Sequence, residues 1–138
     1  MTKILATGVF NILHPGHLMF LNEAKKLGDE LDVIVSSDEI AGSLKKQPLL
    51  PEEQRAEMVG ALKPVDKAFV GDKKDTLALL PVIKPDIIAL GHDQKVDEND
   101  LQSAVSAKGL NAQVVRIKRN LNEDYTASSK IAKFFCRK

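Results

Sequence analysis

The sequence predicts an α/β fold in which five parallel strands form one doubly wound sheet. Short apolar runs rich in β-branched residues recur along the 138 residues, and segments of helical periodicity separate them. Each run is apolar at consecutive positions, which is typical of strands that are buried on both faces. Because strand and helix alternate, right-handed crossovers give a Rossmann-like sheet, whose ligand crevice lies beyond the carboxyl ends of the strands.

The strands and the first helix follow from these patterns. We expect strands at residues 3–7, 31–36, 67–70, 86–90 and 113–117. The first helix is predicted over residues 15–27, because Leu18, Leu21 and Ala24 share one stripe while charged residues face away from it. Gly28 is expected to end this helix, as glycine commonly does at a helix C-terminus.

The later helices are marked by the residues at their ends. Residues 51–62 open with a proline and two glutamates, which suit the first turn of a helix, and Lys63 and Pro64 close the segment. Gly109 is expected to stop a helix that precedes it. The remaining helices are predicted over residues 76–83, 97–108 and 127–135.

Composition describes one ordinary domain and excludes several kinds of partner. With 43% hydrophobic residues, residues 1–138 are predicted to form a single domain. The 20 basic and 19 acidic side chains nearly cancel, so neither a nucleic acid nor a membrane surface is expected as partner. No apolar run approaches the roughly 20 residues that a membrane span needs. Cys136 is the only cysteine, which excludes an intrachain disulfide and favours a cytoplasmic location.

The functional signal lies between the first strand and the first helix. His14 and His17 stand at the start of that helix, where backbone N–H groups and the helix dipole attract anions. Gly16 lets the backbone approach a ligand, and imidazoles three residues apart can reach one polyphosphate. Phosphoryl transfer needs mainly positioning and charge stabilisation, which two histidines can supply. The alternative is that His14 caps the helix and His17 is a packing or surface residue.

The segment from Gly8 to His17 resembles the Gly-Thr-Phe-Asp-x-x-His-x-Gly-His signature of the cytidylyltransferase-like nucleotidyltransferases. The further motifs that resemble the family are Pro51-Glu52-Glu53-Gln54-Arg55, Lys84-Pro85-Asp86-Ile87-Ile88, Gly91-His92-Asp93-Gln94 and Ser128-Ser129-Lys130-Ile131. Within the family, the pattern is most similar to that of the archaeal FAD synthases. This resemblance implies that ATP transfers AMP to FMN, giving FAD and pyrophosphate, with a divalent cation such as Mg²⁺ bridging the triphosphate. Relatives of this size often form homodimers, although the sequence itself is silent on oligomeric state.

The same resemblance implies roles for individual residues. His14 and His17 would be the catalytic residues that bind and neutralise the triphosphate, while Val9 and Phe10 would contact the nucleotide. The other nucleotide-binding positions that it implies are Pro15, Gly16, Asp93, Tyr125, Ser128 and Ser129. Further phosphate contacts are expected from Lys45, Lys46, Arg55 and Arg119. By composition alone, the lysine pair would be ordinary surface charge and the serine pair an ordinary helix cap.

Two other functions stay open. The shared His-x-Gly-His signature keeps a cytidylyltransferase as the alternative activity. Asn122 stands where bacterial glycerol-3-phosphate cytidylyltransferases carry an arginine, which speaks against a CTP-dependent enzyme acting on glycerol 3-phosphate or another small alcohol phosphate. Val9 replaces the usual threonine and Asn11 the usual aspartate. Their loss slightly favours a nucleotide-binding module that senses without turnover.

His92 follows a predicted strand and raises the question of a metal site. Together with His14 and His17 it could converge on zinc at one edge of the sheet. The preferred interpretation is that His92 lines the nucleotide pocket or is simply a polar residue at a strand end, because no carboxylate pattern supports a metal centre. No protein-bound metal is therefore predicted.

Overall fold

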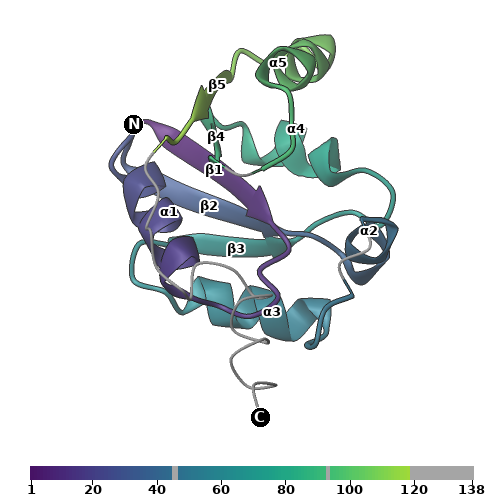
Figure 1. Cartoon of the computed structure of the whole chain (residues 1–138). Helices are drawn as coiled ribbons and strands as arrows, with labels where there is room; N and C mark the ends of the chain where they lie inside the picture. Colours follow the sequence, from purple (N-terminus) through teal and green to yellow (C-terminus); the bar gives the residue numbers. More distant parts are fainter. Residues whose placement is uncertain (45–46, 93, 119–138) are drawn as a thin grey trace.

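The computed structural model describes residues 1–44, 47–92 and 94–118, in which strands and helices alternate (Figure 1). The strands are β1 (Lys3–Gly8), β2 (Glu30–Val35), β3 (Lys67–Val70), β4 (Ile87–Leu90) and β5 (Gln113–Arg116). The helices are α1 (Pro15–Lys25), α2 (Asp38–Ser43), α3 (Glu52–Gly60), the 3-10 helix η1 (Thr76–Leu79), α4 (Leu80–Ile83) and α5 (Glu98–Ala107).

The five strands form one parallel sheet in the order β3-β2-β1-β4-β5. The predicted doubly wound α/β fold is therefore confirmed. The direction in which strands are added reverses at β1, so the crevice between the carboxyl ends of β1 and β4 is the expected ligand site of such a sheet.

Helices cover both faces of the sheet, as Figure 1 shows. On one face, Leu21 and Ala24 of α1 and Val59 of α3 pack with alternate residues of β1 and β2. On the other face, Leu80 and Ile83 of α4, together with α5, pack against the strand residues whose side chains point the opposite way. Each apolar strand thus contributes to two cores, which explains its continuous hydrophobic run.

Of the two helix ends that a glycine was expected to mark, one differs from expectation. Helix α1 is capped by Lys26, so the prediction that Gly28 ends it is wrong. A Cβ on Gly28 would lie 2.7 Å from the Thr2 carbonyl oxygen, so this glycine allows a close backbone approach instead. Gly109 follows α5 with a positive φ of 74°, as a helix-ending glycine should.

Helix content was otherwise predicted well, with two exceptions. The segment 76–83 begins as a 3-10 turn before it becomes α-helical. Helix α2 was not predicted, because its six residues are too few to show a periodic stripe; the Ser37 side chain caps it. The helix predicted over residues 127–135 lies outside the described residues. Among the described helices, none has the length and apolar character needed to cross a membrane.

Candidate active site

The turn that follows β1 has an unusual backbone. Phe10 adopts a positive φ of 52°, a region that costs a residue with a side chain about 1–2 kcal/mol. Its ring is 5% exposed and folds back over Gly8, where an added Cβ would lie 2.8 Å from the ring. Glycine at position 8 is therefore required for the ring of Phe10 to occupy this place.

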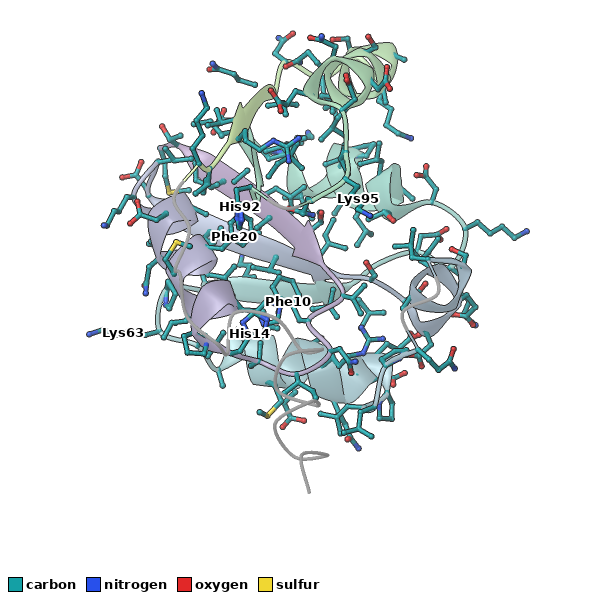
Figure 2. The ribbon with its side chains drawn as sticks, in the orientation of Figure 1. Phe10, His14, Phe20, Lys63, His92 and Lys95 are labelled. Carbon is teal, nitrogen blue, oxygen red and sulfur yellow. The ribbon has the colours of Figure 1, made fainter. Side chains whose placement is uncertain are left out.

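His14 and His17 form a reciprocal cap at the start of α1. The backbone N–H of His17 donates to Nδ1 of His14 at 3.4 Å, and the backbone N–H of His14 donates to Nδ1 of His17 at 3.3 Å. The two rings stack with centroids 3.7 Å apart and planes inclined by 21°. Phe10 supports the pair from the side, with its ring centroid 5.2 Å from that of His17. Figure 2 shows Phe10 and His14 together beside this turn.

The reciprocal cap determines the chemistry that the histidines can offer. Because each Nδ1 accepts a backbone N–H, a neutral ring carries its proton on Nε2. The cap predicted as an alternative role for His14 is thus present, but it engages Nδ1 and leaves Nε2 as the donor atom. Two donors of this kind at the positive end of a helix suit the oxygens of a polyphosphate.

Arg55 of α3 is buried behind this turn, with a side chain that has no exposed surface. Nη1 donates to the carbonyl oxygens of Val9 and Ser36 at 2.8 and 2.9 Å, and Nε donates to the Leu50 carbonyl at 2.9 Å. Nη2 pairs with Asp38 at 2.6 Å. The phosphate contact expected of Arg55 stays a prediction, whereas these contacts join the ends of β1 and β2 to the segment that leads into α3.

Asn11 adds a second connection between the same two parts of the chain. Its side-chain oxygen accepts a hydrogen bond from the Leu49 backbone N–H at 2.7 Å. Asparagine and aspartate side chains both carry an oxygen that can accept such a bond, so this contact does not require the aspartate that is usual in the family. Leu49 also lines a surface hollow of about 280 Å³, whose other lining residues are Asp38, Gln47, Pro48, Leu50 and Pro51.

Arg116, at the end of β5, organises the loop that follows β4. Its Nη1 donates to the carbonyls of Gly91 and Gln94, both at 2.8 Å, and Nε contacts Glu98 at 2.7 Å. The Gln94 side chain accepts from the Gly91 N–H and donates to the Thr7 carbonyl of β1. From the sequence, Arg116 would be solvated surface charge, although it stands with Lys118 and Arg119 at the carboxyl end of a predicted strand, which borders the crevice. That position was the sequence signal for the ligand edge of the sheet, whereas its contacts with the loop after β4 depend on the pairing of Arg116 with Leu90 in the adjacent strand.

The structure brings part of the predicted site together. The residues Val9, Phe10, His14, Pro15, Gly16 and His17 form one turn, and Arg55 reaches its backbone. The predicted positions Lys45, Lys46, Asp93, Arg119, Tyr125, Ser128 and Ser129 lie outside the described residues. Exposed His92 follows β4, and within residues 1–44, 47–92 and 94–118 no three histidine, cysteine or acidic side chains gather to hold a metal ion.

The fold and the capped histidine turn define a nucleotidyltransferase, and comparison with known proteins agrees. The model of the cytidylyltransferase-like family matches residues 5–134, so the chain belongs to this family. The chain is 52% identical over 133 residues to the FAD synthase of Archaeoglobus profundus, covering 96% of this chain and 85% of that protein. It is 55% identical over 117 residues to the FAD synthase of Methanosarcina mazei, covering 85% and 77%.

Solved structures give the same fold. A crystal structure described as the lipopolysaccharide core biosynthesis protein of Thermoplasma volcanium superposes with a TM-score of 0.84 at 44% identity, covering 88% of this chain and 99% of that one. The pantoate-beta-alanine ligase of Francisella tularensis, solved with a nucleotide and beta-alanine, shares the fold alone. Its TM-score is 0.66 at 15% identity, with coverage of 96% and 65%.

Proposed function

We propose that this protein is an FMN adenylyltransferase that transfers AMP from ATP to FMN and releases pyrophosphate. The relatives named FAD synthase support the reaction, since they are 46–55% identical to this chain over most of its length. The observation within the molecule that carries the proposal is the reciprocally capped His14–His17 pair at the start of α1. The CTP-dependent alternative has no comparable support.

The reaction is an in-line displacement at phosphorus. A phosphate oxygen of FMN attacks the α-phosphorus of ATP and forms the new P–O bond, while the bond from that phosphorus to the oxygen shared with the β-phosphorus breaks. Pyrophosphate carries away the electron pair of the broken bond. His14 and His17 donate through Nε2 to the triphosphate and offset the charge that develops on the leaving group, so no covalent enzyme intermediate is required.

The substrate contacts are assigned by the resemblance and by the placement of loops. The histidine turn at the end of β1 would take the phosphates, and the loop after β4, held by Arg116 and Gln94, would take the nucleoside. Asp93 and Tyr125 are proposed for the nucleoside side of the site. The proposed further phosphate contacts are Lys45, Lys46, Arg119, Ser128 and Ser129.

A divalent cation, with Mg²⁺ as the natural choice, would enter as part of the ATP substrate. The described residues gather no cluster of three metal-ligating side chains. Mg²⁺ commonly binds through substrate phosphates and water rather than through a protein cage. When bound, the cation would neutralise charge on the triphosphate. We also infer that residues 1–138 act as one domain, because both cores share a single sheet.

The test is to incubate the purified protein with Mg²⁺, ATP and FMN and to separate the products by chromatography. FAD together with stoichiometric pyrophosphate is the expected result. Parallel reactions with CTP and glycerol 3-phosphate test the alternative, because a CDP-linked product there, with no FAD from ATP, would reassign the substrate pair. If no combination of NTP and acceptor released pyrophosphate, the protein would be a nucleotide sensor instead.

A further inference from the structure

We propose that Arg55 is a positioning residue for the reaction, which sets the catalytic histidines through the peptide between Val9 and Phe10. Arg55 lies on α3, 38 positions from His17 in the sequence (55 minus 17), and it contacts neither imidazole among its hydrogen bonds. Its influence therefore has to pass through the backbone of the turn. This inference rests on the proposed function for its kinetic test, but not for its spectroscopic one.

The anchor of the arrangement is the guanidinium itself. It is fully buried, and its nitrogens donate to three backbone carbonyls and to Asp38. The planar, rigid fork of donors allows one side chain to hold several acceptors in fixed relative positions. A lysine at this position would keep the charge but lose that fork.

The next link is the strained residue that follows Val9. The carbonyl that Arg55 holds belongs to the peptide that enters Phe10, and the φ of Phe10 is positive at 52°. A phenylalanine occupies this region only where its surroundings hold it there. The 2.8 Å bond from Arg55 fixes the orientation of the peptide, while the absent side chain of Gly8 leaves room for the ring.

The last link runs from the ring of Phe10 to the imidazoles. Phe10 lies against His17 at an interplanar angle of 59°, and His17 in turn stacks on His14. If the peptide before Phe10 were released, the ring would leave this position and the His17 ring would lose its lateral support. The reciprocal cap, whose two bonds are already long at 3.3 and 3.4 Å, would loosen with it.

The primary test replaces Arg55 by lysine and measures two quantities. The kcat for FAD formation is expected to fall about 10- to 100-fold, as small displacements of reacting groups do elsewhere, with the KM for ATP changing less than about threefold. In ¹⁵N NMR of the protein without ligands, the Nδ1 signal of His17 is expected to move from the unprotonated range toward the average of two tautomers. Unchanged histidine signals in the folded variant would overturn the proposal.

A double-mutant cycle with Phe10→Leu tests the route. If Arg55 acts through Phe10, the double variant should lose no more turnover than the worse single variant, because both changes break one chain of contacts. Losses that multiply would show two independent effects and would refute the route.

Val59→Ala is the matched control for general destabilisation. Val59 is buried on the same helix one turn after Arg55, in the apolar cluster that also includes Phe10, but its side chain has no group that could hydrogen-bond to the turn. This variant should lower the Tm while leaving kcat and the histidine signals unchanged; a shift like that of Arg55→Lys would contradict the proposal.

A second variant covers the case in which Arg55→Lys does not fold. Asp38→Ala removes the half-exposed partner of Nη2 and should change turnover and the His17 signal in the same direction by a smaller amount. Wild-type values for both would count against the proposal. If the wild-type protein made no FAD, the proposed function would fail, whereas the NMR comparison would still decide whether Arg55 positions the histidines.

Discussion

Two charged side chains are buried equally deeply near opposite ends of the parallel sheet, and they are partnered very differently. Arg55, behind the carboxyl ends of β1 and β2, is 1% exposed and donates from every guanidinium nitrogen. Asp32, toward the amino end of β2, is also 1% exposed, yet within the described residues its Oδ1 has no hydrogen-bond partner. Both charged side chains are thus fully buried, but only Arg55, near the histidine turn, has a hydrogen-bond partner for each of its charged nitrogens.

The shortage around Asp32 has a specific form. Glu30 lies two residues earlier on the same face of β2, and in the described part of the chain its buried Oε2 also lacks a hydrogen bond. Burial, followed by the hydrogen bond and the charge of the adjacent Glu30, raises the pKa of Asp32 to about 6, although the charges of Lys3 and Lys67 act in the opposite direction. Lys3 and Lys67 reach Oε2 of Glu30 only at ion-pair distances of 3.7 and 4.0 Å, so the two adjacent carboxylates are relieved when they hold one proton between them. Protonation relieves the buried charge here, whereas four hydrogen-bond acceptors compensate the buried charge of Arg55.

The largest expected effect on stability comes from removing the buried guanidinium of Arg55. Arg55→Met should destabilise the protein by about 3–5 kcal/mol, because it removes one partner from a buried network and leaves three carbonyls and Asp38 without their donor. The free energy of unfolding from urea titration measures this. A loss below about 1 kcal/mol would mean that water replaces the guanidinium readily and that the two ends differ little.

His17→Ala tests catalysis, rather than stability, at the end of the sheet where Arg55 lies. We expect kcat to fall about 10²- to 10³-fold, as the loss of one transition-state donor does in other enzymes. The matched variant at the other end is Asp32→Asn, which should keep turnover within about twofold because Asp32 lies away from the histidine turn. Initial rates of FAD formation at saturating ATP and FMN measure both. Near-wild-type turnover of His17→Ala would remove the proposed mechanism.

Asp32→Asn should stabilise the folded protein, whereas most core substitutions destabilise it. The gain in the free energy of unfolding should depend on pH. The folded-state pKa of Asp32 is raised from 3.8 to about 6, so the folded protein binds more protons than the unfolded chain between these values. Wild-type stability from this group is therefore present at low pH and is lost as the pH rises from about 4 to about 6.

The measurement for Asp32 is the difference between two stability curves. Unfolding free energies of wild type and Asp32→Asn, taken between pH 4 and pH 8, cancel the contributions of the other groups. The variant should gain about 1–3 kcal/mol relative to wild type over this range, most of it below pH 7. Parallel curves would show that the pKa of Asp32 is the same in the folded and unfolded states and would erase the contrast with Arg55.

The smallest effect is expected at the loop after β4. Arg116→Lys loses the guanidinium fork that holds the carbonyls of Gly91 and Gln94. We expect this loss to weaken ATP binding by about 1 kcal/mol. The KM for ATP should therefore rise roughly fivefold, with little change in kcat. Steady-state kinetics with ATP as the varied substrate checks this. A fall in kcat with unchanged KM would place Arg116 with Arg55 as a residue that positions the catalytic groups.

Local patterns were sufficient wherever a property depends on neighbouring residues. The five strands occur within one residue of their predicted ends, because each is a continuous apolar run bounded by polar residues. The start of α1 and the pairing of His14 with His17 also follow from spacing alone. Helix α2 escaped prediction because a single turn capped by Ser37 leaves no periodic signal.

The sequence by itself determined the doubly wound sheet, the histidine turn at its switch point and the family to which the chain belongs. Only the tertiary structure decided that Arg55 and Arg116 hold loops, that Gly28 makes room for the Thr2 carbonyl, and that Asp32 is buried beside Glu30. The physical reason is that hydrogen-bond partners and desolvation depend on groups from distant segments, which the order of residues does not place. Hydrophobic periodicity, in contrast, is a local property that each segment carries alone.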